Sequence, residues 1–138
     1  MSGFSTEWLK LREPYDLRAR NPVVLNAVFA SLAGRPSVAI VDLACGNGST
    51  FRALSPRIEA LQDWRLVDND LSLLARVPPS SPPRIGVTTL PVDLNRDLEA
   101  VFDRAADLIT TSALLDLVSE DWLNRLVVEA ALRRMPVY

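Results

Sequence analysis

Short apolar runs alternate with amphipathic stretches along most of the 138-residue chain. The run Val38–Val41 is β-branched and bounded by turn formers, which predicts a buried strand. Three further strands and the start of a fifth are predicted within the ranges Trp64–Val67, Ile85–Val92, Ala106–Thr110 and Met135–Tyr138. Strands that alternate with helices in this way are typical of a doubly wound, mostly parallel α/β sheet, here with its first four to five strands.

Helix signals fill the segments between these strands and precede the first of them. Ser5 and Asn21 are typical N-caps, Pro22 suits a first helical position, and Gly34 suits a helix end. Residues 1–36 are therefore expected to form a helical extension or lid, and residues 37–138 the α/β domain. Further helices are predicted over residues 50–60, which contain Pro56, over 71–76 and 97–104, and from Ser119 onward, with a surface loop at Val77–Pro83.

Composition narrows the possible functions. Apolar residues make up 49% of the chain and charged residues 23%, which indicates a globular domain. The net charge of −2 gives no basic surface for nucleic acid. Cys45 is the only cysteine and histidine is absent, so an internal disulfide, a multi-cysteine or histidine-ligated metal site and histidine-based catalysis are excluded. No apolar run approaches the roughly 20 residues of a membrane span, and a cytoplasmic protein without a signal peptide is expected.

An aspartate follows or ends each of the first three predicted strands: Asp42, Asp68 and Asp93. The carboxyl ends of parallel strands lie on one edge of the sheet, where ligands bind in doubly wound folds. The three carboxylates are therefore expected to converge there. Aspartate is common in turns, which explains any one of them alone. It is the occurrence of three in succession that favours a ligand site at this edge.

The turn after the first strand contains Gly46 and Gly48 and leads into a helix. Asp68 follows Gly48 by 20 residues, which suits a carboxylate that binds a ribose. A dinucleotide site prefers a third glycine, but that position is Phe51. Asp42 just before the turn disfavours a pyrophosphate and favours a cationic or zwitterionic ligand. Arginines 12, 18 and 20 either form a solvated face or place one guanidinium over the turn, where it would meet a ligand carboxylate.

Four segments in order then resemble one family. Val41–Gly48 resembles the first motif of class I S-adenosylmethionine (SAM)-dependent methyltransferases, an acid followed by G-x-G. Leu66–Asp70 resembles the second motif, whose acid binds the ribose, and Val92–Leu94 resembles the third, which meets the adenine. Asp107–Leu117 is similar to the segment that lines the methionine end and opens toward the substrate.

The resemblance implies SAM as cofactor and S-adenosylhomocysteine (SAH) as product. No segment resembles a site for nucleic acid or peptide, which favours a small-molecule acceptor, and no metal is expected. The cofactor-binding residues it implies are Asp42, Ala44, Gly46, Gly48, Asp68, Asn69, Asp93, Leu94, Thr110 and Thr111. Asp116 is a weak candidate for a base or substrate orienter, because a solvated helix acid is the simpler explanation. A non-catalytic nucleotide-binding or interaction domain on the same scaffold, and a nicotinamide-dependent oxidoreductase, stay open as alternatives.

The family's sheet has seven strands, whereas this sequence stops at Tyr138, where a fifth strand would begin. We therefore expect a C-terminally truncated version of the domain that keeps the cofactor residues and lacks much of the acceptor pocket. The fourth strand is then expected to be a sheet edge that is either exposed or covered by a partner. That partner would be a second copy of the chain or a missing C-terminal segment. Turnover by this chain alone is left open.

Overall fold

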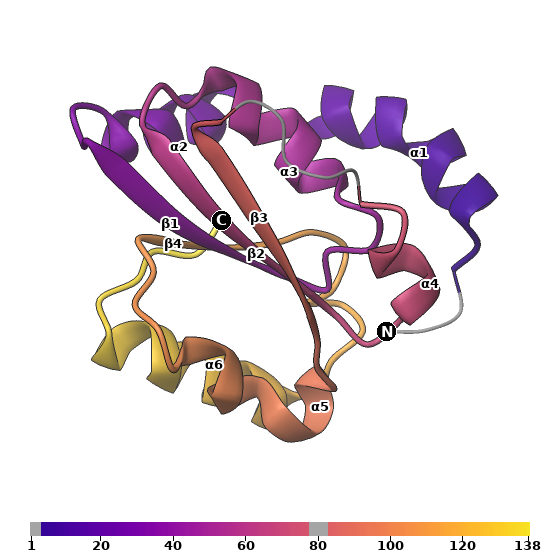
Figure 1. Cartoon of the computed structure of the whole chain (residues 1–138). Coiled ribbons are helices and arrows are strands. Elements are labelled where there is room, and N and C mark those ends of the chain that lie inside the picture. The colour runs from indigo at the N-terminus through magenta and orange to yellow at the C-terminus, as the bar shows by residue number, and fades with distance from the viewer. Residues whose placement is uncertain (1–3, 78–82) are drawn as a thin grey trace.

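A four-stranded parallel sheet forms the centre of the protein in the computed structural model, which describes residues 4–77 and 83–138 (Figure 1). The strands are β1 (Ser37–Leu43), β2 (Leu61–Asp68), β3 (Ile85–Pro91) and β4 (Leu108–Thr111), in the spatial order β3-β2-β1-β4. The predicted doubly wound α/β fold is confirmed, and β1 and β2 extend beyond their predicted ranges at both ends. The loop predicted at Val77–Pro83 lies mostly outside the described residues.

Helices cover both faces of this sheet. The α-helices are α1 (Thr6–Ala19), α2 (Pro22–Leu32), α3 (Ser49–Leu54), α4 (Leu71–Leu74), α5 (Leu94–Asp97) and α6 (Glu120–Leu132), and the short 3₁₀ helices are η1 (Ser55–Arg57) and η2 (Leu98–Phe102). Figure 1 shows α2 and α3 on one face and α5 and α6 on the other, while α1 and α4 lie at the edge where the strands end. No helix within residues 4–77 and 83–138 is long and apolar enough to cross a membrane.

Local capping explains where several helices begin. The side chain of Ser5 accepts a hydrogen bond from the amide of Trp8, and Asn21 caps α2 with Pro22 at its first position. The helix predicted over residues 97–104 starts earlier, because Asp93 accepts the amide of Asn95 and caps α5. The helix predicted over residues 50–60 is shorter than expected, ending at Leu54 and continuing as η1 around a proline.

The strands divide the core into two layers, as the alternation of side chains requires. Val38 and Ile40 of β1 pack toward α2 and α3, whereas Val41 and Leu43 pack toward α5 and α6. Phe51, at the position of the absent third glycine, is buried in the first layer. Its ring meets Trp64 edge-on, with the ring centroids 5.1 Å apart. An aromatic side chain therefore fills the space between α3 and β2.

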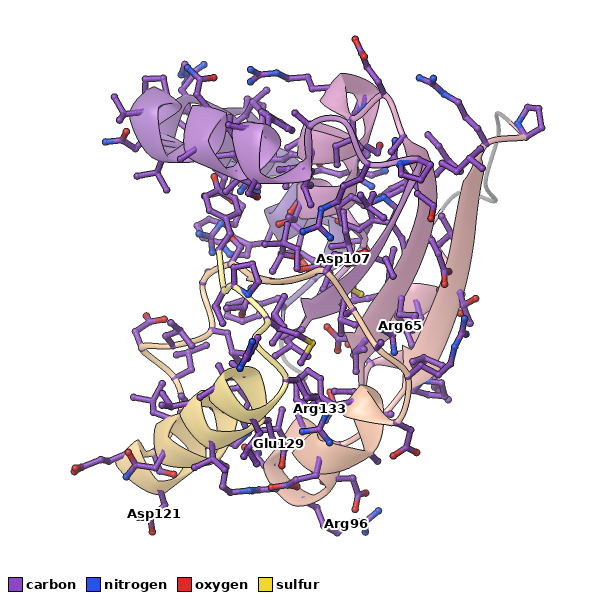
Figure 2. The ribbon with its side chains drawn as sticks, turned by 90° about the vertical axis from the view of Figure 1, so that its left-hand side faces the viewer. Arg65, Arg96, Asp107, Asp121, Glu129 and Arg133 are labelled. Carbon is purple, nitrogen blue, oxygen red and sulfur yellow. The ribbon has the colours of Figure 1, made fainter. Side chains whose placement is uncertain are left out.

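Arg65 of β2 is a buried charged residue in the second layer, with 3% of its surface exposed. Its guanidinium donates to the backbone carbonyls of Val101, Arg104 and Ala105 at 2.9–3.2 Å. Figure 2 shows Arg65 on the sheet above the helical layer, with Asp107 on the segment that leads into β4. Asp107 in turn accepts the amide of Ala39 at 2.8 Å. These bonds attach the connection between η2 and β4 to the centre of the sheet.

The edge of β4 is not open, which corrects the expectation from the sequence. The amide of Tyr138 donates to Ile109, and the amides of Ile109 and Thr111 donate to Pro136 and Tyr138, all at 2.9 Å. Val137 forms a parallel bridge with Ile109, so residues 136–138 pair as the predicted start of a fifth strand. On the β4 side of the sheet, any uncovered backbone edge therefore belongs to this short segment.

Candidate functional site

The turn between β1 and α3 has an unusual backbone. Ala44, Gly46 and Gly48 have φ angles of +54°, +58° and +95°, which lie in the left-handed region. Glycine adopts such angles freely, whereas an alanine there is strained by roughly 1–2 kcal/mol. The amide of Cys45 donates to the carbonyl of Val67 at 2.9 Å and holds the turn against β2. The fixed turn places Ala44 and Gly46, which are partly exposed, beside a cavity at the edge where the strands end.

Asp42, the last polar residue of β1, is buried directly beneath this turn, with 1% of its surface exposed. Its Oδ1 accepts a 2.8 Å hydrogen bond from the hydroxyl of Thr110. Its Oδ2 has no hydrogen-bond partner among the described residues. Burial raises the pKa of Asp42 to about 7, reinforced by the charge of Asp68 and opposed by the Thr110 bond and the charge of Arg20.

Cys45 is packed beside these acids. It is 6% exposed, and burial, followed by the charges of Asp42 and Asp68, raises the pKa of its thiol far above the ordinary range. A thiol that stays protonated is a poor nucleophile. Cys45 therefore fills space in the turn and is not poised as a nucleophile.

Asp68 at the end of β2 is equally buried, with 2% of its surface exposed. Its Oδ2 accepts the amide of Gly46 at 2.9 Å, and its Oδ1 accepts the amide of Asp70 at 3.0 Å. One carboxylate thus joins the glycine turn to the segment that starts α4.

Two small cavities of about 60 and 70 Å³ lie on either side of Gly46 at this edge of the sheet. They share the lining residues Leu9, Arg12, Ala44, Gly46, Ser112 and Ala113. Asp42 lines the first cavity and Asp68 lines the second. The two cavities are therefore two ends of one cleft, each with a buried carboxylate, and we call this the turn cleft.

Helix α1 forms one wall of the turn cleft. The Leu9 side chain lies 3.5 Å from the point where a Cβ on Gly46 would stand. Glu13 forms two 2.8 Å hydrogen bonds with Arg52 of α3, and Arg52 also donates to the carbonyl of Asn47 in the turn. The N-terminal extension is therefore attached to the turn by both apolar and charged contacts.

The structure brings together only part of the residue set inferred from the sequence. Asp42, Ala44, Gly46 and Asp68 line the turn cleft, and Thr110 touches it through its bond to Asp42. Outside the cleft linings are Gly48, Asn69, Asp93, Leu94, Thr111 and Asp116. The carboxylate of Asp93 caps α5, and the carbonyl of Leu94 accepts the indole N–H of Trp122 at 2.7 Å.

Leu9 and Asp16 of α1 line the turn cleft without having been predicted. Nothing in the sequence pattern of α1 marks them, since no residue of this helix, as the structure describes it, is buried. Ser112 and Ala113 belong to the segment after β4 that the sequence already associated with the ligand, although they were not singled out. The Ala113 backbone also has a positive φ, of +54°.

A larger cavity of about 680 Å³ lies away from this cleft, between the end of α2 and η1. Its lining includes Phe29, Arg35, Arg57 and Glu59. It contains no buried carboxylate and lies near the starts of β1 and β2, away from the carboxyl ends of the strands, so volume alone does not identify it as the site. In the described part of the chain, no group of three or more potential ligand side chains is arranged to hold a metal ion.

Comparisons with known proteins bear on the fold. No protein-family model matches the sequence, and no curated protein matches it. Solved structures do match, beginning with the plantazolicin methyltransferase BpumL in complex with SAH, at a TM-score of 0.61 and 16% identity. The match covers 97% of this chain and 50% of BpumL.

Two further matches are a cyclopropane synthase and a synthase-like protein. The cyclopropane synthase MmaA2 from Mycobacterium tuberculosis matches with a TM-score of 0.61 and 15% identity, over 83% of this chain and 38% of MmaA2. A cyclopropane-fatty-acyl-phospholipid synthase-like protein from Lactobacillus casei matches with a TM-score of 0.53 and 16% identity, over 90% of this chain and 54% of that protein. The chain thus has the Rossmann-like methyltransferase fold and spans about half the length of these structures.

Proposed function

We propose that this chain binds SAM in the turn cleft and is the cofactor-binding half of a methyltransferase that acts on a small-molecule acceptor. The observation that carries the proposal is the Oδ2 of buried Asp42, which has no hydrogen-bond partner within residues 4–77 and 83–138 and lies in a cleft whose other end holds Asp68. A buried carboxylate oxygen without a donor is costly. A cationic ligand group beside it would remove that cost.

The residues present suit the parts of SAM. Asp42 would accept the ammonium of the methionine end, and Asp68, with Asn69 beside it, would accept the ribose hydroxyls. Gly46 presents no side chain to the cleft, and Leu9 lies within van der Waals range of this position, so a ligand that crosses the turn here would have to displace Leu9. Asp93 and Leu94, at the end of β3, are proposed to contact the adenine, and Gly48 to keep the turn open for the ligand.

SAM, when bound, supplies a methyl group on a sulfonium that is already electrophilic. The chain's own task is then to position that group, because in-line transfer depends on alignment. Thr110 and Thr111 end β4 next to the cleft, and the hydroxyl of Thr111 is buried without a partner among the described residues. We propose that Thr111 turns this hydroxyl to a ligand atom and that Asp116 orients the acceptor or takes its proton.

The neighbouring surface is consistent with a further polypeptide beside this half. The side chains of Val127 and Leu132 on α6 are 63% and 75% exposed, next to the short segment 136–138. We propose that a second copy or a C-terminal segment covers this surface and completes the acceptor pocket. The nicotinamide alternative lacks structural support, since Phe51 fills the position of the third glycine.

Isothermal titration calorimetry with SAH, SAM and NAD tests the proposed cofactor. We expect SAH and SAM to bind with one ligand per chain and NAD to give no heat. Asp68→Asn should weaken SAH binding at least tenfold, because a ribose acceptor is lost. Binding of NAD together with no response to SAH or SAM would refute the proposal.

A further inference from the structure

Arg12 occupies a central place in the turn cleft, because its side chain lines both cavities. Its Nε donates to Oδ2 of Asp16 at 2.9 Å, and its Nη2 donates to Oδ1 at 3.1 Å. This is the bidentate geometry in which a guanidinium binds a carboxylate most specifically. Both side chains are 32% exposed, so the pair lies at the mouth of the cleft.

Asp16 and Asp42 line the same cavity of about 60 Å³. That cavity therefore contains a carboxylate oxygen of Asp42 that has no partner in the described part of the chain. It also contains the guanidinium of Arg12, whose two donors are bonded to the Asp16 side chain. An α-amino acid group carries an ammonium and a carboxylate on one carbon. Such a group would satisfy the Asp42 oxygen and would present a second carboxylate to Arg12.

We propose that Arg12 receives the carboxylate of the ligand's amino-acid end and that Asp16 is an internal stand-in which this carboxylate displaces. The proposal rests on the proposed function and adds the recognition of this end of the cofactor. Asp16 can leave at little cost, because it is partly exposed and becomes hydrated at the surface of α1. Asp16 thus lowers the affinity for ligands with a carboxylate and leaves other ligands unaffected.

The other arginines of the extension are placed differently. The guanidinium of Arg18 lies over the ring of Tyr15, 4.7 Å from its centroid, and lines neither cavity of the turn cleft as described. Arg20 donates to Thr50 at 3.0 Å and to the hydroxyl of Tyr138 at 3.4 Å, and it lines a separate cavity between α1 and α3. Of these three arginines, only Arg12 lines the turn cleft and forms a bidentate pair with a carboxylate there.

Calorimetry with two ligands tests the proposal: SAH, and its decarboxylated analogue, which keeps the ammonium and lacks only the carboxylate. We expect Arg12→Ala to weaken SAH binding about 10- to 100-fold, the size of a lost charged hydrogen-bond pair, and to change binding of the analogue less than about twofold. Asp16→Ala should tighten SAH binding severalfold and leave the analogue unchanged. Arg18→Ala is the matched control and should alter neither ligand.

Several results would overturn the proposal. Arg12→Ala could weaken both ligands equally or neither, or Arg20→Ala could cause the carboxylate-specific loss instead. Asp16→Ala could leave SAH affinity unchanged. This result would count against the proposal even if the Arg12 variant failed to fold. If wild-type protein bound neither ligand, the proposed function itself would fail, and that outcome is distinct because the wild-type titration shows it before any variant is made.

Discussion

The hydroxyl of Thr110 on β4 donates a 2.8 Å hydrogen bond to the carboxylate of Asp42 on β1, and the two residues are register partners in the parallel sheet. Both are buried, at 0% and 1% exposure. A shift of one residue in register would turn Thr110 to the other face. Strand pairing therefore fixes which oxygen of Asp42 is satisfied and which one faces the ligand.

The burial of Asp42, which suits it to bind a cationic ligand, lowers the stability of the fold when the carboxylate is ionised. Its pKa is raised in the folded state, from 3.8 to about 7, so folding favours the protonated form. The associated stability is fully present below about pH 4 and is lost as the pH rises through 7. We expect Asp42→Asn to stabilise the fold by about 2–4 kcal/mol at pH 8 and by much less at pH 4.

Urea denaturation at several pH values measures this difference. The exposed Asp103→Asn change is a control that should leave the pH dependence of the unfolding free energy as in the wild type. A variant at position 42 that is less stable than wild type at pH 8 would show that the carboxylate is stabilised by contacts rather than strained by burial.

Affinity for SAH should depend on pH through the same group. Ionised Asp42 attracts an ammonium, and its pKa of about 7 means that ionisation rises from a small to a large fraction between pH 6 and 8. We expect SAH affinity to increase about tenfold over this range in the wild type. The Asp42→Asn variant should bind weakly at both pH values, and a wild-type affinity without pH dependence would contradict the role of Asp42.

Ala44 carries backbone strain that a glycine would remove. With φ at +54°, Ala44→Gly relieves roughly 1–2 kcal/mol of strain and loses part of it to the greater freedom of the unfolded chain. We expect a net gain of about 0.5–1 kcal/mol in the free energy of unfolding. The control Ala39→Gly, within β1, should instead destabilise by about 0.5–1 kcal/mol. Equal losses at both positions would refute the strain at Ala44.

Arg65 should be one of the most sensitive charged residues of the fold. Arg65→Ala leaves the carbonyls of Val101, Arg104 and Ala105 without this donor, and we expect a loss of about 2–4 kcal/mol in urea unfolding. Arg104→Ala is the matched control, because its ion pair with Asp63 is exposed and should contribute less than about 1 kcal/mol. A similar small loss at both positions would contradict a structural role for Arg65.

Ligand binding should move α1. The two cavities of about 60 and 70 Å³ are well below the roughly 300–1,000 Å³ of sites for ligands of this size. Trp8 lies on α1 and is 48% exposed, whereas Trp64 and Trp122 are buried. We expect SAH to change the tryptophan fluorescence and Trp8→Phe to abolish that change while binding persists. An unchanged spectrum during saturation by calorimetry would show that α1 stays in place.

The parts of the site that local patterns determine were predictable. Asp42 and Asp68 end apolar runs, and their meeting at one edge follows from parallel strand order. Leu9 and Asp16 were not predictable, because their place depends on how α1 docks, and Trp8, Leu11 and Tyr15 on that helix are exposed. At Asp93 the preference of aspartate for helix N-caps competes with the expected ligand contact, because its side chain caps α5.

The pairing of residues 136–138 with β4 was missed for a related reason. The start of a fifth strand was predicted, but its consequence for the edge depends on tertiary hydrogen bonds that no pattern within Met135–Tyr138 specifies. The boundaries of η2 likewise reflect packing: Val101 and Phe102 are buried in the core layer that also contains Trp122. For these two segments, the presence of an element could be predicted from the sequence, whereas its ends and its pairing depend on tertiary contacts.

A structure of the chain crystallised with SAH tests the central claim most directly. We predict SAH in the turn cleft, with its ammonium within hydrogen-bond distance of Asp42 Oδ2, its ribose hydroxyls at Asp68 and its carboxylate on Arg12 in place of Asp16. SAH bound in the larger cavity between α2 and η1, or with its ribose at Asp42 and its amino-acid end at Asp68, would contradict the account.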